Sequence, residues 1–288
     1  MDPTSPAVPH PVRRSRIDAG DVKLAVNQRG DPAHPTLVLV HGYPDTQAVW
    51  DELAGLLADR FHVVSYDVRG AGASTAPGST AGYAFPLLIA DLEAVIQAVS
   101  PDRPVHLVGH DWGGGHVLNV AMARPDLLRS WASDVIGVFA PDYVWHDLAQ
   151  VWQTPGDGEK LVDTMMGGTV EDRAGRMREL GIPGDVAVQL AEGQGPEMGR
   201  CILALYRSAA QPVLAQAGES LPSAAARPGL AISPTEDYYV GSLEGRRRAA
   251  GKAGARVVEL HGLAHWWMLQ DPARGAAMLT EFWSSLPE

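Results

Sequence analysis

Short apolar runs alternate with stretches of helical spacing along most of the chain. A short apolar run is typical of a strand buried on both faces, whereas apolar positions three or four residues apart are typical of a helix. The alternation therefore predicts a parallel sheet covered by helices on both faces. The predicted strands are Leu37–Val40, His62–Tyr66, Val105–Val108, Trp131–Val138, Gly229–Ile232 and Val257–Leu260. The predicted helices between them are Ala48–Asp59, Pro86–Ala98 and Gly114–Ala123.

Two segments depart from this alternation. Arg16–Asp18 and Lys23–Asn27 enclose a short turn and predict an antiparallel hairpin. Residues 140–227 carry several helical patterns and no clear strand, which predicts an all-helical insertion between two core strands. We expect this insertion to form a lid over the site. Its predicted helices are Tyr143–Gln153, Glu159–Met166, Glu171–Leu180, Asp185–Glu192 and Met198–Ala209.

The composition limits the possible partners. A chain of 288 residues with 45% hydrophobic content is long enough for one large domain, or for a core with an inserted lid. The formal net charge of -11 argues against binding to nucleic acid or to an anionic membrane surface. Cys201 is the only cysteine, so no intramolecular disulfide can form.

The chain also lacks the usual signals for export or membrane insertion. Residues 1–14 are predicted to be a mobile tail, because the segment is rich in proline and has no unbroken apolar stretch of the kind a signal peptide carries. No segment approaches the roughly 18 apolar residues of a membrane span. We therefore expect a cytoplasmic protein.

A five-residue motif carries the strongest chemical signal. Gly109-His110-Asp111-Trp112-Gly113 follows an apolar run and opens a helical pattern, which is the spacing of a nucleophile elbow. Its glycines are expected because the turn is strained and crowded. The apex residue is Asp111, where a lipase or esterase carries serine. A carboxylate attacks saturated carbon, as in an epoxide or alkyl halide, and leaves an alkyl ester on the enzyme.

Two more motifs follow predicted strands. His41-Gly42-Tyr43-Pro44 comes after Leu37–Val40, and residues 67–74 come after His62–Tyr66. With the elbow, these motifs resemble the α/β-hydrolase superfamily, and in particular its epoxide hydrolase and haloalkane dehalogenase branch. The resemblance implies an α/β-hydrolase fold, with a mostly parallel eight-stranded sheet, flanking helices and an all-helical lid. The core would comprise residues 15–139 and 228–288, and the lid residues 140–227.

The same resemblance implies a catalytic triad. Asp237 matches the position of the family's acid, and His265 matches the histidine of the family's Gly-His-Trp motif, with Ala264 in place of the glycine. Asp111 would then be the nucleophile, His265 the base and Asp237 its orienting partner. The backbone N–H groups of Tyr43 and Trp112 would form the oxyanion hole.

In the lid, the resemblance is only partial. Tyr206 matches one of the two tyrosines that hydrogen-bond the epoxide oxygen in epoxide hydrolases. The position of the other tyrosine falls at Leu148, which cannot donate a proton. Tyr143, His146 or Trp152 could compensate and are predicted to contact substrate, but the sequence does not choose among them.

Three hypotheses for the function follow. The leading one is an epoxide hydrolase that forms an alkyl ester on Asp111, which His265-activated water then hydrolyses. The alternative is a haloalkane dehalogenase with the same triad, in which the Trp112 indole would bind the halide. A third is a non-catalytic protein that binds a small molecule. We expect a small-molecule substrate and no metal or cofactor, because no closely spaced ligand set is evident; the oligomeric state is left open.

Overall fold

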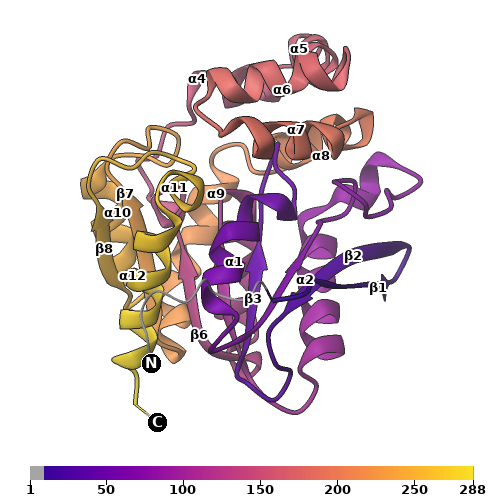
Figure 1. Ribbon diagram of the computed structural model, residues 1–288. Coiled ribbons are helices and arrows are strands. Elements are labelled where there is room, and N and C mark those ends of the chain that lie inside the picture. Colours follow the sequence, from indigo (N-terminus) through magenta and orange to yellow (C-terminus); the bar gives the residue numbers. More distant parts are fainter. Residues whose placement is uncertain (1–9, 288) are drawn as a thin grey trace.

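Eight strands form a single sheet in the order β1-β2-β4-β3-β5-β6-β7-β8. The computed structural model describes residues 10–287, and Figure 1 shows the sheet between helices. The first two strands pair with each other in antiparallel fashion, β2 pairs antiparallel with β4, and all other pairs are parallel. The strands are β1 (Arg13–Ala19), β2 (Val22–Arg29), β3 (Thr36–Val40), β4 (His62–Tyr66), β5 (Val105–Gly109), β6 (Leu128–Ser133), β7 (Gly229–Pro234) and β8 (Arg256–Leu260).

The central strands are buried on both faces because helices cover each side. Every residue of β3, β4, β5 and β7 is buried, as their continuous apolar runs predict. The helices on one face are α1 (Asp51–Leu57), α11 (Trp267–Gln270) and α12 (Pro272–Ser284), and those on the other are α2 (Phe85–Val99), α3 (Trp112–Ala123) and α10 (Leu243–Lys252). The carboxyl ends of the parallel strands therefore meet at one edge, where α/β proteins bind ligands.

A layer of helices lies across the carboxyl edge of the sheet, at the top of Figure 1. It is formed by the segment between β6 and β7, as the break in the sequence pattern predicts. Its helices are α4 (Asp147–Gln153), α5 (Asp157–Met166), α6 (Val170–Glu179), α7 (Gly184–Glu192) and α8 (Pro196–Ser208), and the short helix α9 (Val213–Ala217) lies below them in the view. The division of the chain into a core and a lid stays a prediction.

Short 3-10 helices complete the connections. One of them, Gln47–Trp50, lies at the start of the segment predicted as the single helix Ala48–Asp59. Another, Gly218–Ala226, follows α9 in a segment for which no helix was predicted. The others are Thr80–Tyr83, Pro125–Leu127 and Ile136–Phe139.

Two boundaries predicted from the sequence are wrong. The strand predicted over Trp131–Val138 ends at Ser133, and Ile136–Phe139 is a 3-10 helix instead. A short apolar run cannot be assigned to strand or buried helix by periodicity alone. The tail predicted over residues 1–14 ends earlier, because β1 begins at Arg13, which pairs with Gln28. The first six residues of this edge strand are not fully buried, so they lack a continuous apolar pattern. The rest of the predicted tail, residues 1–9, lies outside the described residues.

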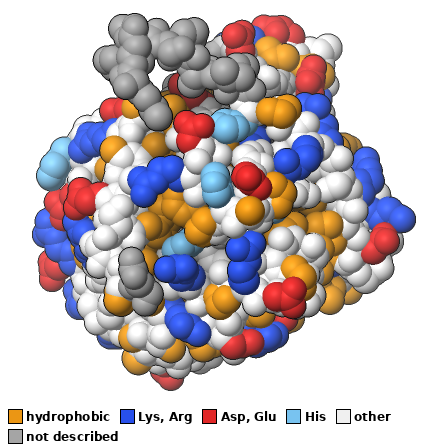
Figure 2. Space-filling model, turned by 60° about the horizontal axis from the view of Figure 1, so that its bottom comes forward, with side chains coloured by type: hydrophobic (Ala, Val, Ile, Leu, Met, Phe, Trp, Pro, Cys, Tyr) orange, Lys and Arg blue, Asp and Glu red, His pale blue; other side chains and the backbone are white. Residues whose placement is uncertain are grey.

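Charged side chains are mixed on the surface away from the helical layer. Figure 2 turns the bottom of the molecule forward and shows acidic and basic side chains interspersed, without a face of one sign. None of the helices within residues 10–287 is both long enough and apolar enough to cross a membrane.

Candidate active site

Asp111 occupies the sharp turn between β5 and α3. Its backbone has φ 51° and ψ -130°, and among the described residues it is the only non-glycine residue with positive φ. The turn leaves no room for side chains: a Cβ on Gly113 would overlap the backbone oxygen of Val40, and one on Gly109 would overlap the Gly113 carbonyl. The predicted elbow geometry therefore depends on its two flanking glycines, and it lifts Asp111 above the carboxyl edge of the sheet.

Backbone N–H groups hold the Asp111 carboxylate. The Tyr43 N–H donates to Oδ1 at 2.8 Å, and the neighbouring Trp112 N–H favours the charged form of the carboxylate and so lowers its pKa. The loop after β3 approaches so closely that a Cβ on Gly42 would overlap this carboxylate. Burial raises the pKa of Asp111, while His265, His110 and the two N–H groups oppose that rise. The structure thus brings together the three residues predicted to form the nucleophile and the oxyanion hole.

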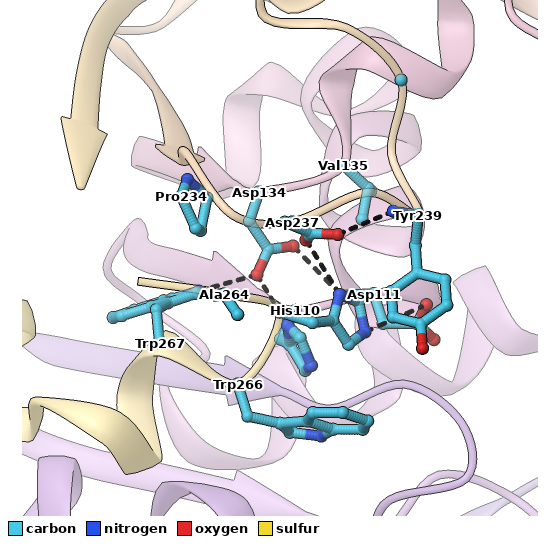
Figure 3. Close-up of polar contacts among 12 residues, drawn as sticks. His110, Asp111, Asp134, Val135, Pro234, Asp237, Tyr239, Ala264, Trp266 and Trp267 are labelled. Carbon is cyan, nitrogen blue, oxygen red and sulfur yellow. Dashed lines mark hydrogen bonds and ion pairs between the residues drawn. The ribbon is translucent and has the colours of Figure 1, made fainter. Parts of the chain in front are cut away.

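His265 and Asp237 lie beside Asp111. His265 Nδ1 lies 2.9 Å from Asp237 Oδ2, and His265 Nε2 lies 3.9 Å from Asp111 Oδ2. The other Asp237 oxygen accepts the N–H of Tyr239 at 2.9 Å (Figure 3). Burial opposes the charge on both groups, yet their mutual attraction prevails, so the pKa of His265 is raised and that of Asp237 is lowered. The geometry matches a base oriented by an acid.

A second histidine–carboxylate network lies beneath the elbow, and the sequence analysis missed it. Asp134 Oδ1 accepts the Asp111 N–H at 3.1 Å, and Asp134 Oδ2 lies 2.6 Å from His110 Nδ1. His110 Nε2 lies 3.5 Å from Asp45. Indole N–H groups of Trp266 and Trp267 donate to Asp45 and Asp134 respectively. Figure 3 shows Asp134 between His110 and Trp267. This network fixes the backbone of Asp111 from below.

The sequence held a signal for Asp134. Polar residues at the carboxyl ends of parallel strands are the usual candidates for a site. Asp134 directly follows β6, but the predicted strand ran on to Val138 and so placed Asp134 inside it.

A cavity of about 350 Å³ opens above Asp111. Its walls are mostly apolar and aromatic, and they come from α2, α3, the loop after β6 and the helical layer. Among the described residues, no Lys or Arg side chain lines it. The polar side chains in its lining are Asp111, Asn119, His146, Tyr206, Ser208 and Tyr239. Such a chamber suits a small neutral molecule. Within the described residues no group of three or more His, Cys, Asp or Glu could hold a metal.

Only two of the four predicted lid residues reach this cavity. Tyr206, on α8, packs edge-on against the Trp112 ring, and burial together with the Asp111 charge raises its pKa well above 10, so its hydroxyl keeps its proton. His146 also lines the cavity. Tyr143 instead donates its hydroxyl to the Tyr239 carbonyl at 2.7 Å, and Trp152 packs behind Tyr206. Neither is part of the cavity lining, so the predicted substrate contact of these two finds no support.

The chain is similar to known proteins over part of its length. Residues 35–164 match the family model described as alpha/beta hydrolase fold. "Probable oxidoreductase EphD" of Mycobacterium tuberculosis is 38% identical over 148 residues, which are 48% of this chain and 24% of that protein. "Epoxide hydrolase A" of the same organism is 35% identical over 118 residues, which are 41% of this chain and 36% of that protein. "Fluoroacetate dehalogenase" of a Burkholderia species is 36% identical over 135 residues, which are 46% of this chain and 42% of that protein. The chain thus spans less than half the length of these curated relatives.

Solved structures agree with the fold over nearly the whole chain. Epoxide hydrolase VrEH1 from Vigna radiata superposes with a TM-score of 0.76 at 17% identity, covering 96% of this chain and 98% of that one. Haloalkane dehalogenase DbeA from Bradyrhizobium elkani gives 0.73 at 20% identity, covering 96% and 100%. The predicted fold class is therefore confirmed, with its mostly parallel eight-stranded sheet. The chain therefore has the α/β-hydrolase fold, and its residues 35–164 match the model of that family.

Proposed function

We propose that this protein is an epoxide hydrolase that opens an epoxide to a vicinal diol through a covalent ester on Asp111. The observation that carries the proposal is the environment of that carboxylate. Oδ1 accepts the backbone N–H of Tyr43, while Oδ2 faces His265 and the carboxylate borders an apolar cavity. Similarity to proteins named epoxide hydrolase supports the same reaction.

In the first step, Asp111 Oδ2 attacks one epoxide carbon. A carbon–oxygen bond forms to the enzyme, the epoxide carbon–oxygen bond breaks, and its electron pair goes to the epoxide oxygen. Tyr206, whose raised pKa keeps its hydroxyl protonated, gives that oxygen a proton. The mostly apolar walls of the cavity strengthen these interactions because they lower the local dielectric constant.

In the second step, water hydrolyses the ester. His265 removes a proton from water, and the resulting hydroxide attacks the ester carbonyl carbon. Negative charge then develops on Oδ1, where the Tyr43 N–H already points at 2.8 Å. Asp237 stabilises the imidazolium of His265, which then protonates the departing alkoxide; the proton left on Asp111 returns to Tyr206 by way of solvent.

The test separates the two steps. In His265→Gln the base is removed but the nucleophile remains, so styrene oxide should alkylate the protein and the ester should persist. Intact-protein mass spectrometry should show one added substrate mass, located on Asp111 by peptide mapping. Asp111→Asn is the matched control and should stay unmodified. Diol formation by His265→Gln at the wild-type rate, with no adduct, would refute the covalent mechanism.

A dehalogenase is the second candidate, because Trp112 borders the cavity and could hold a halide with its indole N–H. The similarity to a fluoroacetate dehalogenase also favours this reading. Halide release from 1-bromobutane or fluoroacetate, measured beside diol formation from styrene oxide, distinguishes the two reactions. A cavity without a cationic side chain among the described residues argues against a carboxylate substrate such as fluoroacetate.

A further inference from the structure

The polar lining of the cavity holds more than one hydrogen-bond donor. Tyr206, on α8, lines the cavity, and so does His146, which is the N-cap residue of α4. Their ring centroids lie 6.1 Å apart with the planes at 82°. Leu148, where the sequence comparison places a second tyrosine, is absent from the lining and packs against the hydrophobic core instead.

The role of His146 as a helix cap determines which nitrogen carries its proton. Its Nδ1 accepts the Ala149 N–H at 3.2 Å, so Nδ1 holds a lone pair and the neutral ring must carry its hydrogen on Nε2. Nε2 has no hydrogen-bond partner within residues 10–287. One edge of the imidazole is therefore used to cap the helix, and a free N–H remains on the other edge of a ring that lines the cavity.

The surroundings keep this donor neutral. Burial and the nearby His265 lower the pKa of His146 to about 4, although Asp237 and Asp147 oppose the shift. A neutral His146 imidazole can donate a hydrogen bond without placing a positive charge beside His265, which itself becomes positively charged in the proposed reaction. It can stabilise a developing alkoxide and keep its own proton.

We propose that His146 Nε2–H and the Tyr206 hydroxyl together hold the epoxide oxygen, so that His146 takes the place of the missing second tyrosine. The inference rests on the proposed function. Asp111 Oδ2 forms the bond to carbon, the epoxide carbon–oxygen bond breaks, and Tyr206 supplies the proton. His146 stabilises the same oxygen through its hydrogen bond. Two neutral donors facing an apolar chamber select an uncharged epoxide, whose only strong acceptor is the ring oxygen.

Two substitutions separate the capping role from the catalytic role. In His146→Asn, the short side chain can still cap α4 through Oδ1, but it places no donor at the position of Nε2. In His146→Gln, the amide nitrogen can reach that position, but the cap is lost. Each variant is made in the His265→Gln background, so that the rate of adduct formation from styrene oxide reports ring opening alone.

The two variants should show opposite effects. We expect His146→Asn to keep its melting temperature and to lose about 10- to 100-fold in the maximal rate of alkylation. We expect His146→Gln to melt about 2–4 °C lower while recovering most of that rate. The epoxide concentration at half-maximal rate should change much less than the maximal rate in His146→Asn, because the interaction strengthens in the transition state.

Tyr239 provides the matched comparison, because its ring borders the same cavity and lies 5.0 Å from both His146 and His265. Tyr239→Phe should lose less of the alkylation rate than His146→Asn does. A full rate in His146→Asn would overturn the inference and leave the proposed function intact, and a large loss confined to Tyr239→Phe would assign the second donor to Tyr239. If styrene oxide and 1,2-epoxyoctane give neither adduct nor diol with any form of the enzyme, both proposals fail.

Discussion

At the scale of single residues, burial disfavours the charged form of several groups in the site, and neighbouring hydrogen-bond donors and charges favour it. Asp111 is buried, and burial raises its pKa, but two backbone N–H groups and the nearby histidines favour its anion. Tyr206 is buried next to that anion, which makes loss of its own proton harder. Both pKa values are raised, but because a carboxyl group is a far stronger acid than a phenol, the site can hold Asp111 ionised while Tyr206 keeps its proton. This is the pairing that ring opening requires.

Tyr206→Phe tests the acid at this scale. The change removes the hydroxyl and keeps the ring that packs against Trp112 and Trp152. Ring opening should slow by about 10- to 1,000-fold because the alkoxide loses its proton donor. Rapid-quench measurement of ester formation from styrene oxide gives the rate. Any turnover of 1-bromobutane should barely change, because halide departure needs no proton, and equal losses on both substrates would assign Tyr206 to packing.

At the scale of elements, the sequence predicts what depends on local pattern and spacing. The elbow around Asp111 and the strands β3, β4 and β5 can be read from apolar runs and the residues that follow them, whereas Asp237 and His265 were predicted only from the family resemblance. The network under the elbow could not be predicted in this way, because it joins groups far apart in the sequence, such as Asp45 and Trp266. The residues that line the cavity could not be predicted either, because packing between helices decides which face of α4 or α8 points inward.

The crowding at the elbow gives a prediction at this scale. A methyl group added in Gly113→Ala would meet the backbone oxygens of Val40 and His41, which have little freedom to move. We expect a loss of about 1–3 kcal/mol or more in the free energy of unfolding, together with loss of activity.

Gly175→Ala, in the middle of α6, is the matched control, because nothing lies within 4 Å of its added Cβ. That change should be neutral or stabilise the protein by about 0.5–1 kcal/mol. Urea denaturation followed by circular dichroism measures both values. Equal stability of the two variants would show that the strand-to-helix junction tolerates a side chain.

At the scale of the whole molecule, the helical layer and the sheet meet beside the proposed oxyanion hole. The Gln194 side chain donates to the Pro44 carbonyl at 2.9 Å, one residue beyond Tyr43. The Gly72 N–H donates to the Gly193 carbonyl, also at 2.9 Å. At the start of α8, the Tyr83 hydroxyl donates to Glu197 at 3.0 Å. The helical layer is thus hydrogen-bonded to loops of the core near Asp111, so both walls of the cavity are positioned together.

The charge of the molecule and the lining of the chamber together predict its selectivity. A carboxylate substrate would approach a chain of net charge -11 and would have to leave water for a cavity in which the described lining offers no Lys or Arg. It would also lie near the Asp111 anion. We expect kcat/KM for 3-phenylglycidate to be at least about 100-fold below that for styrene oxide, because burying an unpaired charge is costly. Diol formation from the two epoxides, compared at low and high salt, measures the difference in kcat/KM.

High salt should reduce only the part of this difference in kcat/KM that arises from long-range repulsion between the substrate and the chain. Equal turnover of the two epoxides would mean that a cation reaches the bound carboxylate, which the described cavity lining does not provide.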